Sequence, residues 1–467
     1  MKKTKIICSI GPASCDPLVM EKMVYAGMNV ARINFSHATL EEKQGVVNAV
    51  KEVRDRTGVQ VAILYDTKGP EFRNGMLEND QINLIEGKKI RIVKENVLGN
   101  EERFSVNHPQ AIDGLNVGDT LLLENGLMKI EIISKEMDGV TGIVIAGGVL
   151  GNKKSLNVPN VKLDIPFISD SDREDLIYAC KNDGDFVALS FVNTCEDVLE
   201  AREIFKEYGR EDIKVISKIE SATGFENLDE ILEVSDGIMV ARGDLGVEVP
   251  LESLPFYQKT IIRKCREHGK ICIVATEMLE SMKKNVRPTR AEVSDIANAV
   301  LDGTDAVMLS GETTTGLHPI DAVKYMAEIC ENTEKHFDKN FGSIRTVDIT
   351  ETIAKSVVDS ASMLDVKVIV VATMSGYSAR KISNLKPNSF VLATCPTEAV
   401  ARSLALCWGV YPKVVEIYNS TDEVVKDAKI RATEFLNLKK NDIIVITGGF
   451  PNNTATKKTN FMKIEEI

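Results

Sequence analysis

Short runs of β-branched and aliphatic residues alternate with longer amphipathic segments, and this alternation constrains the fold more than any other feature of the chain. Most runs have the length of one strand and precede a segment with helical periodicity. Such alternation is typical of β/α units around a parallel sheet. Eight runs before residue 310 are predicted to be strands: Lys5–Ile10, Met28–Ile33, Val61–Asp66, Phe186–Ser190, Lys214–Lys218, Gly237–Ala241, Ile271–Ala275 and Ala306–Leu309.

Eight such units predict a (β/α)8 barrel, the TIM-barrel fold, with an open doubly wound sheet as the alternative. The third unit is interrupted, because residues 69–160 show short alternating strands and turn signals such as Asp113-Gly114 instead of helical periods. We therefore predict a barrel made of residues 1–68 and 161–338. Its third β/α loop would carry an all-β domain that can act as a lid over a site.

A second change of pattern, near residue 338, predicts a separate C-terminal α/β domain over residues 339–467. Four runs in this part are predicted to be its strands: Val368–Ala372, Phe390–Ala393, Val410–Val415 and Asp442–Thr447.

The charge of the chain limits its partners. With 57 Lys and Arg against 69 Asp and Glu, the net charge is −12. A general binder of nucleic acid or of anionic membranes needs a basic surface, so neither partner is expected. Nine cysteines without a C-x-x-C pair predict reduced thiols, and no apolar run is long enough for a signal peptide or a membrane span. We expect a cytoplasmic protein.

Polar residues end many of the predicted strands. In a barrel, catalytic groups project from the carboxyl ends of the strands, so these residues should meet at one mouth. Any one of them alone would more often be a solvated strand end, but their number favours a site. They are Arg32, Asp66, Lys218, Glu220, Asp244 and Thr276.

Lys218 and Glu220 are two residues apart, which places both side chains on one face of a strand. Glu220 and Asp244 would then be two neighbouring carboxylates, a ligand set that suits Mg²⁺. A simple ion pair between Lys218 and Glu220 is the structural alternative. A metal next to Lys218 and Arg32 favours phosphate chemistry, although the chain has no G-x-x-x-x-G-K-[ST], G-x-G-x-x-G or H-E-x-x-H motif.

Six stretches, in this order, resemble the pyruvate kinase family: Ala31–His37, Asp66–Arg73, Val215–Ser221, Asp236–Pro250, Arg287–Glu292 and Leu301–Thr313. The resemblance extends over essentially the whole chain and implies the same architecture of barrel, lid and C-terminal domain. It also implies the bacterial type without an appended phosphocarrier-like domain, and a homotetramer.

The resemblance implies a role for each strand-end residue. Arg32 would bind the phosphoryl group, Lys218 would neutralise its charge in transfer, and Thr276 would belong to the proton relay that completes pyruvate. Glu220 and Asp244 would hold Mg²⁺ or Mn²⁺. The backbone N–H groups of Gly243 and Asp244 would receive the substrate carboxylate, at a predicted helix start that favours anions.

The same resemblance implies three further sites. Potassium would be bound by Asn34, Ser36, Asp66 and the Thr67 carbonyl, and Glu71 is the residue that potassium-requiring members carry, although it could be only a surface side chain in a turn. Arg73, His37, Asn34 and Lys154 match positions on the nucleotide side. Thr373, Ser375, Gly376 and Ser378 match a loop that binds a sugar-phosphate activator, although the residues alone fit an ordinary capped helix equally well.

Several positions depart from the family pattern, and their effect on turnover stays open: Ala38, Asn125, Asn193, Glu277 and the loop 449–454. All the catalytic matches are present. We therefore predict a pyruvate kinase that converts phosphoenolpyruvate and ADP to pyruvate and ATP. The alternatives are a non-catalytic homologue that senses a sugar phosphate, and an aldol-cleaving enzyme in which Lys218 forms a Schiff base.

Overall fold

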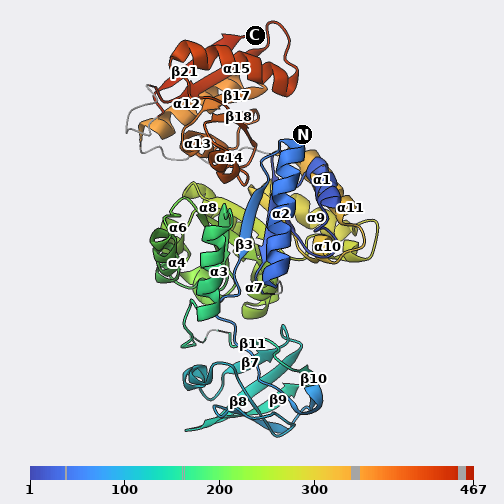
Figure 1. The fold of residues 1–467 in the computed structure, drawn as a ribbon. Coiled ribbons are helices and arrows are strands. Elements are labelled where there is room, and N and C mark those ends of the chain that lie inside the picture. The colour runs from blue at the N-terminus through green and yellow to red at the C-terminus, as the bar shows by residue number, and fades with distance from the viewer. Residues whose placement is uncertain (37–38, 160, 162, 338–347, 451–458) are drawn as a thin grey trace.

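The computed structural model describes residues 1–36, 39–159, 161, 163–337, 348–450 and 459–467. It contains three bodies in a row, with the barrel between the C-terminal domain and the inserted lid (Figure 1). The predicted fold class is confirmed: a closed parallel barrel, an inserted all-β lid and a C-terminal α/β sheet domain.

The barrel closes in the order β1-β16-β15-β14-β13-β12-β3-β2, so the open doubly wound sheet is wrong. Its strands lie where the sequence predicts them, with bounds that shift by two residues or fewer. They are β1 (Lys5–Ser9), β2 (Val30–Asn34), β3 (Ala62–Asp66), β12 (Phe186–Leu189), β13 (Lys214–Ile219), β14 (Gly237–Ala241), β15 (Ile271–Ala275) and β16 (Ala306–Leu309).

Helices surround these strands: α1 (Pro17–Ala26), α2 (Leu40–Thr57), α3 (Asp170–Lys181), α4 (Cys195–Glu207), α5 (Ala222–Glu226), α6 (Leu228–Val234), α7 (Arg242–Glu248), α8 (Leu254–Glu267), α9 (Arg290–Asp302), α10 (Gly311–Thr314) and α11 (Pro319–Glu334), with short turns η3 (Leu251–Ser253) and η4 (Glu280–Lys283). Local sequence defines several helix ends. Helix α9, for example, begins at a capping box of Thr289 and Glu292 and ends at Gly303, whose φ of 98° suits a residue without a Cβ.

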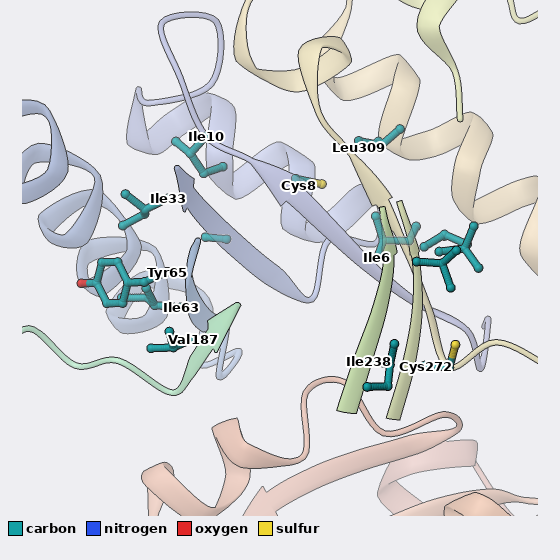
Figure 2. Close-up of a cluster of buried hydrophobic side chains, with 14 of the residues drawn as sticks. Ile6, Cys8, Ile10, Ile33, Ile63, Tyr65, Val187, Ile238, Cys272 and Leu309 are labelled. Carbon is teal, nitrogen blue, oxygen red and sulfur yellow. The ribbon is translucent and has the colours of Figure 1, made fainter. Parts of the chain in front are cut away.

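The strands are mostly apolar because both of their faces are covered, and their charged residues lie near the strand ends. All five residues of β1 and of β14 are buried. One hydrophobic cluster fills the layer between strands and helices, and Figure 2 shows part of it, including Ile6, Ile63 and Ile238.

The lid is built from a two-stranded and a six-stranded sheet. Its elements are η1 (Glu78–Asp80), β4 (Gln81–Leu84), β5 (Lys89–Val93), β6 (Arg103–Ser105), η2 (Pro109–Gly114), β7 (Thr120–Leu123), β8 (Met128–Glu136), β9 (Gly139–Ala146), β10 (Gly148–Gly151) and β11 (Leu156–Asn157). The lid has its own core, so it is a separate folding unit that lies beyond the carboxyl ends of the barrel strands (Figure 1).

The C-terminal domain is a five-stranded sheet in the order β19-β18-β17-β20-β21. Its elements are α12 (Ile349–Met363), β17 (Val368–Ala372), α13 (Tyr377–Asn384), β18 (Phe390–Cys395), α14 (Glu398–Ser403), β19 (Val410–Val414), α15 (Thr421–Leu436), β20 (Ile443–Gly448) and β21 (Phe461–Glu466). Strand β21, which pairs antiparallel with β20 at the sheet edge, was not among the strands predicted from the sequence.

This domain packs on the amino-terminal end of the barrel, opposite the lid (Figure 1). A second hydrophobic cluster combines side chains from the barrel interior, such as Met239, with side chains of the C-terminal domain, such as Val357. Two buried ion pairs join the same surfaces, Arg402 with Asp185 and Lys386 with Asp305.

Candidate active site

Arg32, Asp66 and Lys218 meet at the carboxyl ends of β2, β3 and β13. Arg32 donates through Nε to Asp66 at 2.7 Å, and Lys218 Nζ lies 3.2 Å from the other oxygen of the same carboxylate. Asp66 is 1 % exposed. Burial alone would raise the pKa of Asp66, but the two cations outweigh burial and hold the pKa below its usual value. The carboxylate is therefore ionised and fixes both cations in place.

Lys218 has three polar partners, and the two carboxylates among them keep it charged although it is buried. Its ammonium contacts Asp66, lies 3.0 Å from Glu220 and donates to Ser190 Oγ at 2.7 Å. Burial disfavours the charged form, but the Asp66 and Glu220 carboxylates outweigh burial and raise the pKa of Lys218 above its usual value. The ion pair with Glu220, which was the structural alternative for these residues, is thus present.

Ser190 links Lys218 to Thr67, and its role was not predicted from the sequence. Its hydroxyl accepts from Lys218 and donates to the Thr67 carbonyl at 2.7 Å, while its backbone N–H donates to Thr67 Oγ1 at 3.1 Å. The only available signal was its place directly after β12, where barrels carry functional groups.

Glu220 is 1 % exposed and accepts the Phe191 N–H at 2.7 Å. Phe191 has a φ of 56°, an unusual value for a bulky residue. In this conformation its own N–H points at the Glu220 carboxylate. Burial, with a smaller contribution from Asp244, raises the pKa of Glu220 to about 7 despite Lys218. Asp244 raises this pKa, so its carboxylate lies near that of Glu220, as expected for a residue directly after β13 and one in the first turn of α7.

Gly243 and Asp244 lie in the first turn of α7, as predicted. The Gly243 N–H donates to Thr276 Oγ1 at 2.9 Å, so these two predicted site residues are in direct contact. Thr276 and Glu277 have φ values of 69° and 54°, so two consecutive non-glycine residues adopt the left-handed conformation after β15. Strain of this kind is typical of functional loops.

Arg242 holds this corner together and was also missed by the sequence analysis. Its guanidinium donates to both oxygens of Asp295 at 2.7 Å and to the Thr276 carbonyl at 2.6 Å. It therefore fixes the start of α7 against the strained turn that carries Thr276.

The predicted potassium ligands come from adjacent strands. Asn34 and Asp66 are direct partners in the β2–β3 pairing, and Asn34 Oδ1 accepts the Ser36 N–H at 3.0 Å. The Thr67 carbonyl follows Asp66 and accepts from Ser190. Of these four residues, Asp66 contacts the Arg32 and Lys218 cations directly.

Two of the residues predicted to lie on the nucleotide side belong to the lid. Arg73 forms two hydrogen bonds with the Glu71 carboxylate, at 2.7 and 2.9 Å, and Lys154 pairs with Glu124 at 2.6 Å. No contact among the described residues joins Arg73 or Lys154 to the strand-end cluster. The lid reaches the barrel mouth through Asn157, which donates to Glu248 of α7 at 2.9 Å.

Two of the residues that depart from the family pattern, Asn193 and Asn125, have hydrogen-bond partners nearby in the fold. Asn193 accepts from Ser221 Oγ and donates to the Phe191 carbonyl at 3.1 Å, so it supports the turn after β12. Asn125, with a φ of 58°, accepts from Ser155 at 3.3 Å. His37 and Ala38 lie outside the described residues, as does the part of the loop 449–454 beyond residue 450.

The four predicted effector residues surround the start of α13. Gly376 is the residue before the helix, with a φ of 77°, and its N–H donates to Thr373 Oγ1 at 3.0 Å. Ser378 is buried and shares a hydrogen bond with Thr459. The Ser375 carbonyl accepts from Arg380 at 3.3 Å.

A closed parallel barrel that gathers buried cations and carboxylates at the carboxyl ends of its strands has the form of a barrel enzyme for an anionic substrate. The comparisons with known proteins identify the family. Residues 1–323 match the family model described as "Pyruvate kinase, barrel domain", and residues 351–465 match "Pyruvate kinase, alpha/beta domain".

Relatives of known function and a solved structure indicate the same family. The chain is 46% identical over 473 residues to the pyruvate kinase of Geobacillus stearothermophilus and 45% identical over 475 residues to that of Staphylococcus haemolyticus, with all of this chain covered and 80% and 81% of the relatives. A crystal structure of a pyruvate kinase from Cryptosporidium parvum superposes with a TM-score of 0.94 at 37% identity, covering 100% of this chain and 96% of the other.

The chain belongs to the pyruvate kinase family. It is a phosphotransferase of glycolysis, and phosphoenolpyruvate and ADP are the substrates that the family implies. The family generally uses Mg²⁺ and often K⁺. None of the described helices is both long and apolar enough to cross a membrane.

Proposed function

We propose that the cluster of Arg32, Lys218 and Thr276 performs the phosphoryl transfer from phosphoenolpyruvate to MgADP. The observation that carries this assignment is the Lys218 ammonium, which is buried yet held charged by two carboxylates. A fixed cation in a buried site stabilises the charge that spreads over phosphoryl oxygens in the transition state. Arg32 binds the same group from β2, because Asp66 orients both cations.

The reaction breaks the bond between phosphorus and the enol oxygen and forms a bond to a terminal oxygen of ADP. The enolate then takes a proton at carbon. The Thr276 hydroxyl is too weakly acidic to be the final donor, so it passes on a proton from solvent. Its contact with the Gly243 N–H supports this placement, because a substrate carboxylate bound to the Gly243 and Asp244 N–H groups lies beside Thr276.

Glu220 and Asp244 fit a divalent cation such as Mg²⁺ or Mn²⁺. The raised pKa of Glu220 marks a buried carboxylate whose burial Lys218 alone does not offset, and the structure gives the side chain of Asp244 no hydrogen bond or ion pair among the described residues. Two carboxylates are a ligand set that Mg²⁺ uses together with substrate oxygens. The cation would supply neutralisation of the phosphoryl and enolate oxygens.

Potassium dependence is the second part of the proposal. Asn34, Ser36, Asp66 and the Thr67 carbonyl supply the hard oxygen donors that a monovalent cation needs, and Glu71 is the residue typical of potassium-requiring members. The Glu71 carboxylate is held by Arg73, so its influence reaches the nucleotide side through that guanidinium.

The remaining assignments concern binding and regulation. Arg73, His37, Asn34 and Lys154 would contact the nucleotide once the lid closes. The segment Thr373, Ser375, Gly376 and Ser378 would bind the phosphate of a sugar-phosphate activator, because hydroxyls and N–H groups at a helix start suit that anion. The enzyme would be a cytoplasmic homotetramer with domains at 1–68 and 161–338, 69–160, and 339–467.

The test is pyruvate formation from phosphoenolpyruvate and ADP with magnesium, with and without potassium, beside a Lys218→Met variant. We expect potassium-stimulated turnover that the variant loses. Turnover without potassium would remove the cation assignment and keep the enzyme. A folded protein that binds a sugar phosphate without turnover would favour the sensor, and borohydride trapping of substrate on Lys218 would favour the Schiff-base enzyme.

A further inference from the structure

A cavity of about 230 Å³ lies between the amino-terminal end of the barrel and the C-terminal domain. Its barrel side is formed by residues at the amino-terminal ends of β13, β14 and β15: Lys214 begins β13, and Asp236 and Lys270 directly precede β14 and β15. Its other side is one face of α13, with Tyr377, Arg380, Lys381 and Asn384 at helical spacing. The cavity lies at the opposite end of the barrel from Lys218.

Positive charge dominates the wall of this cavity. Four of its lining residues are Lys or Arg and two are Asp. Both carboxylates are already engaged, because Asp305 pairs with Lys386, and Asp236 accepts from Arg202 at 2.8 Å and from the Val215 N–H at 3.0 Å.

Lys270 and Arg380 lack an ion pair among the described residues. Lys270 donates to the Ser235 carbonyl at 2.7 Å and to the Glu233 carbonyl at 3.4 Å, which leaves one of its three N–H groups. Arg380 donates to the Ser375 carbonyl at 3.3 Å. Burial lowers the pKa of Lys270, and the nearby Arg202 and Lys381 cations lower it further although Asp236 and Glu233 oppose them. Two cations on opposite walls of one cavity therefore have donor capacity that the described protein groups do not use.

We propose that this cavity binds a small phosphate-bearing anion between Lys270 on the barrel and Arg380 on α13. A guanidinium and an ammonium are the usual donors to phosphate oxygens. The volume is below the range of about 300–1,000 Å³ for drug-sized ligands, so it suits inorganic phosphate or a small phosphate monoester rather than a nucleotide.

An anion bound in this cavity would couple the barrel to the C-terminal domain. Arg380 contacts the Ser375 carbonyl in the loop that begins α13, whereas Lys270 belongs to the barrel. An anion shared by the two side chains would tie the C-terminal domain to the barrel. The site is separate from the proposed activator loop, whose Thr373 and Ser378 do not line the cavity.

Lysine acetylation read by peptide mass spectrometry tests the proposal on the full chain, because each lysine is measured separately. The probes are inorganic phosphate and glycerol phosphate, with sodium chloride at matched ionic strength. We expect phosphate to slow the labelling of Lys270 by at least fivefold with saturation at one site, and to leave the exposed Lys88 of the lid unchanged. Protection by glycerol phosphate as well would show that a monoester fits, and protection by inorganic phosphate alone would restrict the site to the free ion.

An Arg380→Gln variant should lose the protection of Lys270 while retaining its melting temperature, and a Thr373→Ala variant should keep the protection. Equal slowing of Lys88, or an Arg380→Gln variant with full protection, would overturn the proposal and indicate an adventitious ion only. Loss of protection in Thr373→Ala would also overturn it, because the anion would then bind in the activator loop.

Discussion

Replacing Ser190 with alanine tests how Lys218, the proposed phosphoryl-transfer cation, is held. The change removes the hydroxyl that accepts from Lys218 at 2.7 Å and donates to the Thr67 carbonyl at 2.7 Å. A buried polar group that loses its partner costs about 1–3 kcal/mol. If Lys218 recovers part of its bonding by moving toward Asp66 and Glu220, its ammonium leaves the position proposed for binding the phosphoryl group. Since 1.4 kcal/mol corresponds to about tenfold in rate, we expect kcat to fall between about 5-fold and 150-fold.

Ser217→Ala is the matched control, because Ser217 is equally buried on the neighbouring β13 and its hydroxyl bonds to Ser235 instead. Both variants should lose similar thermal stability, but only Ser190→Ala should lose kcat in the pyruvate assay. The KM for potassium should also rise in Ser190→Ala, because the Thr67 carbonyl loses its anchor. A folded Ser190→Ala enzyme with the kcat of the wild type would refute the reasoning and show that Asp66 and Glu220 suffice to position Lys218.

Three further predictions concern other parts of the molecule. Lys386→Met leaves Asp305 buried without its cation and should destabilise the chain by about 3–5 kcal/mol, seen as a lower melting temperature. Burial lowers the pKa of Lys5 to about 7, so between pH 7 and about 10 the unfolded chain binds a proton that the folded chain does not. The free energy of unfolding of the wild type minus that of Lys5→Met, measured with urea, should therefore rise in this window by up to about 1.4 kcal/mol per pH unit. A difference that does not change with pH would contradict the prediction. Glu71→Lys places a cation beside Arg73 and should remove the response of turnover to potassium; an unchanged response would exclude Glu71 as its determinant.

The barrel could be predicted from the sequence because its strands are buried on both faces. Continuous apolar runs such as Gly237–Ala241 therefore stand out against amphipathic helices. The strand-end positions of Lys218 and Glu220 could be predicted as well, because a spacing of two fixes their shared face and a barrel brings all carboxyl ends together.

Features that depend on long-range pairing could not be predicted. β21 is a polar edge strand whose residues are mostly exposed or half-buried, so only its antiparallel pairing with β20 defines it. Ser190 and Arg242 have ordinary local surroundings in the sequence. Their importance follows from partners far along the chain, Thr67 and Lys218 for the serine, and Asp295 and Thr276 for the arginine.

The charge balance of the cluster explains why a divalent cation belongs to the proposed site. Its two cations, Arg32 and Lys218, face three carboxylates, those of Asp66, Glu220 and Asp244. With all of them ionised, the formal charge is −1, which opposes a phosphorylated carboxylate. A divalent cation between Glu220 and Asp244 would change the sum to +1, and it would also offset the burial that raises the pKa of Glu220 to about 7. Phosphoenolpyruvate should therefore bind at least tenfold more weakly to the metal-free enzyme, measured by calorimetry, and equal affinity with and without metal would show that Arg32 and Lys218 alone hold the substrate.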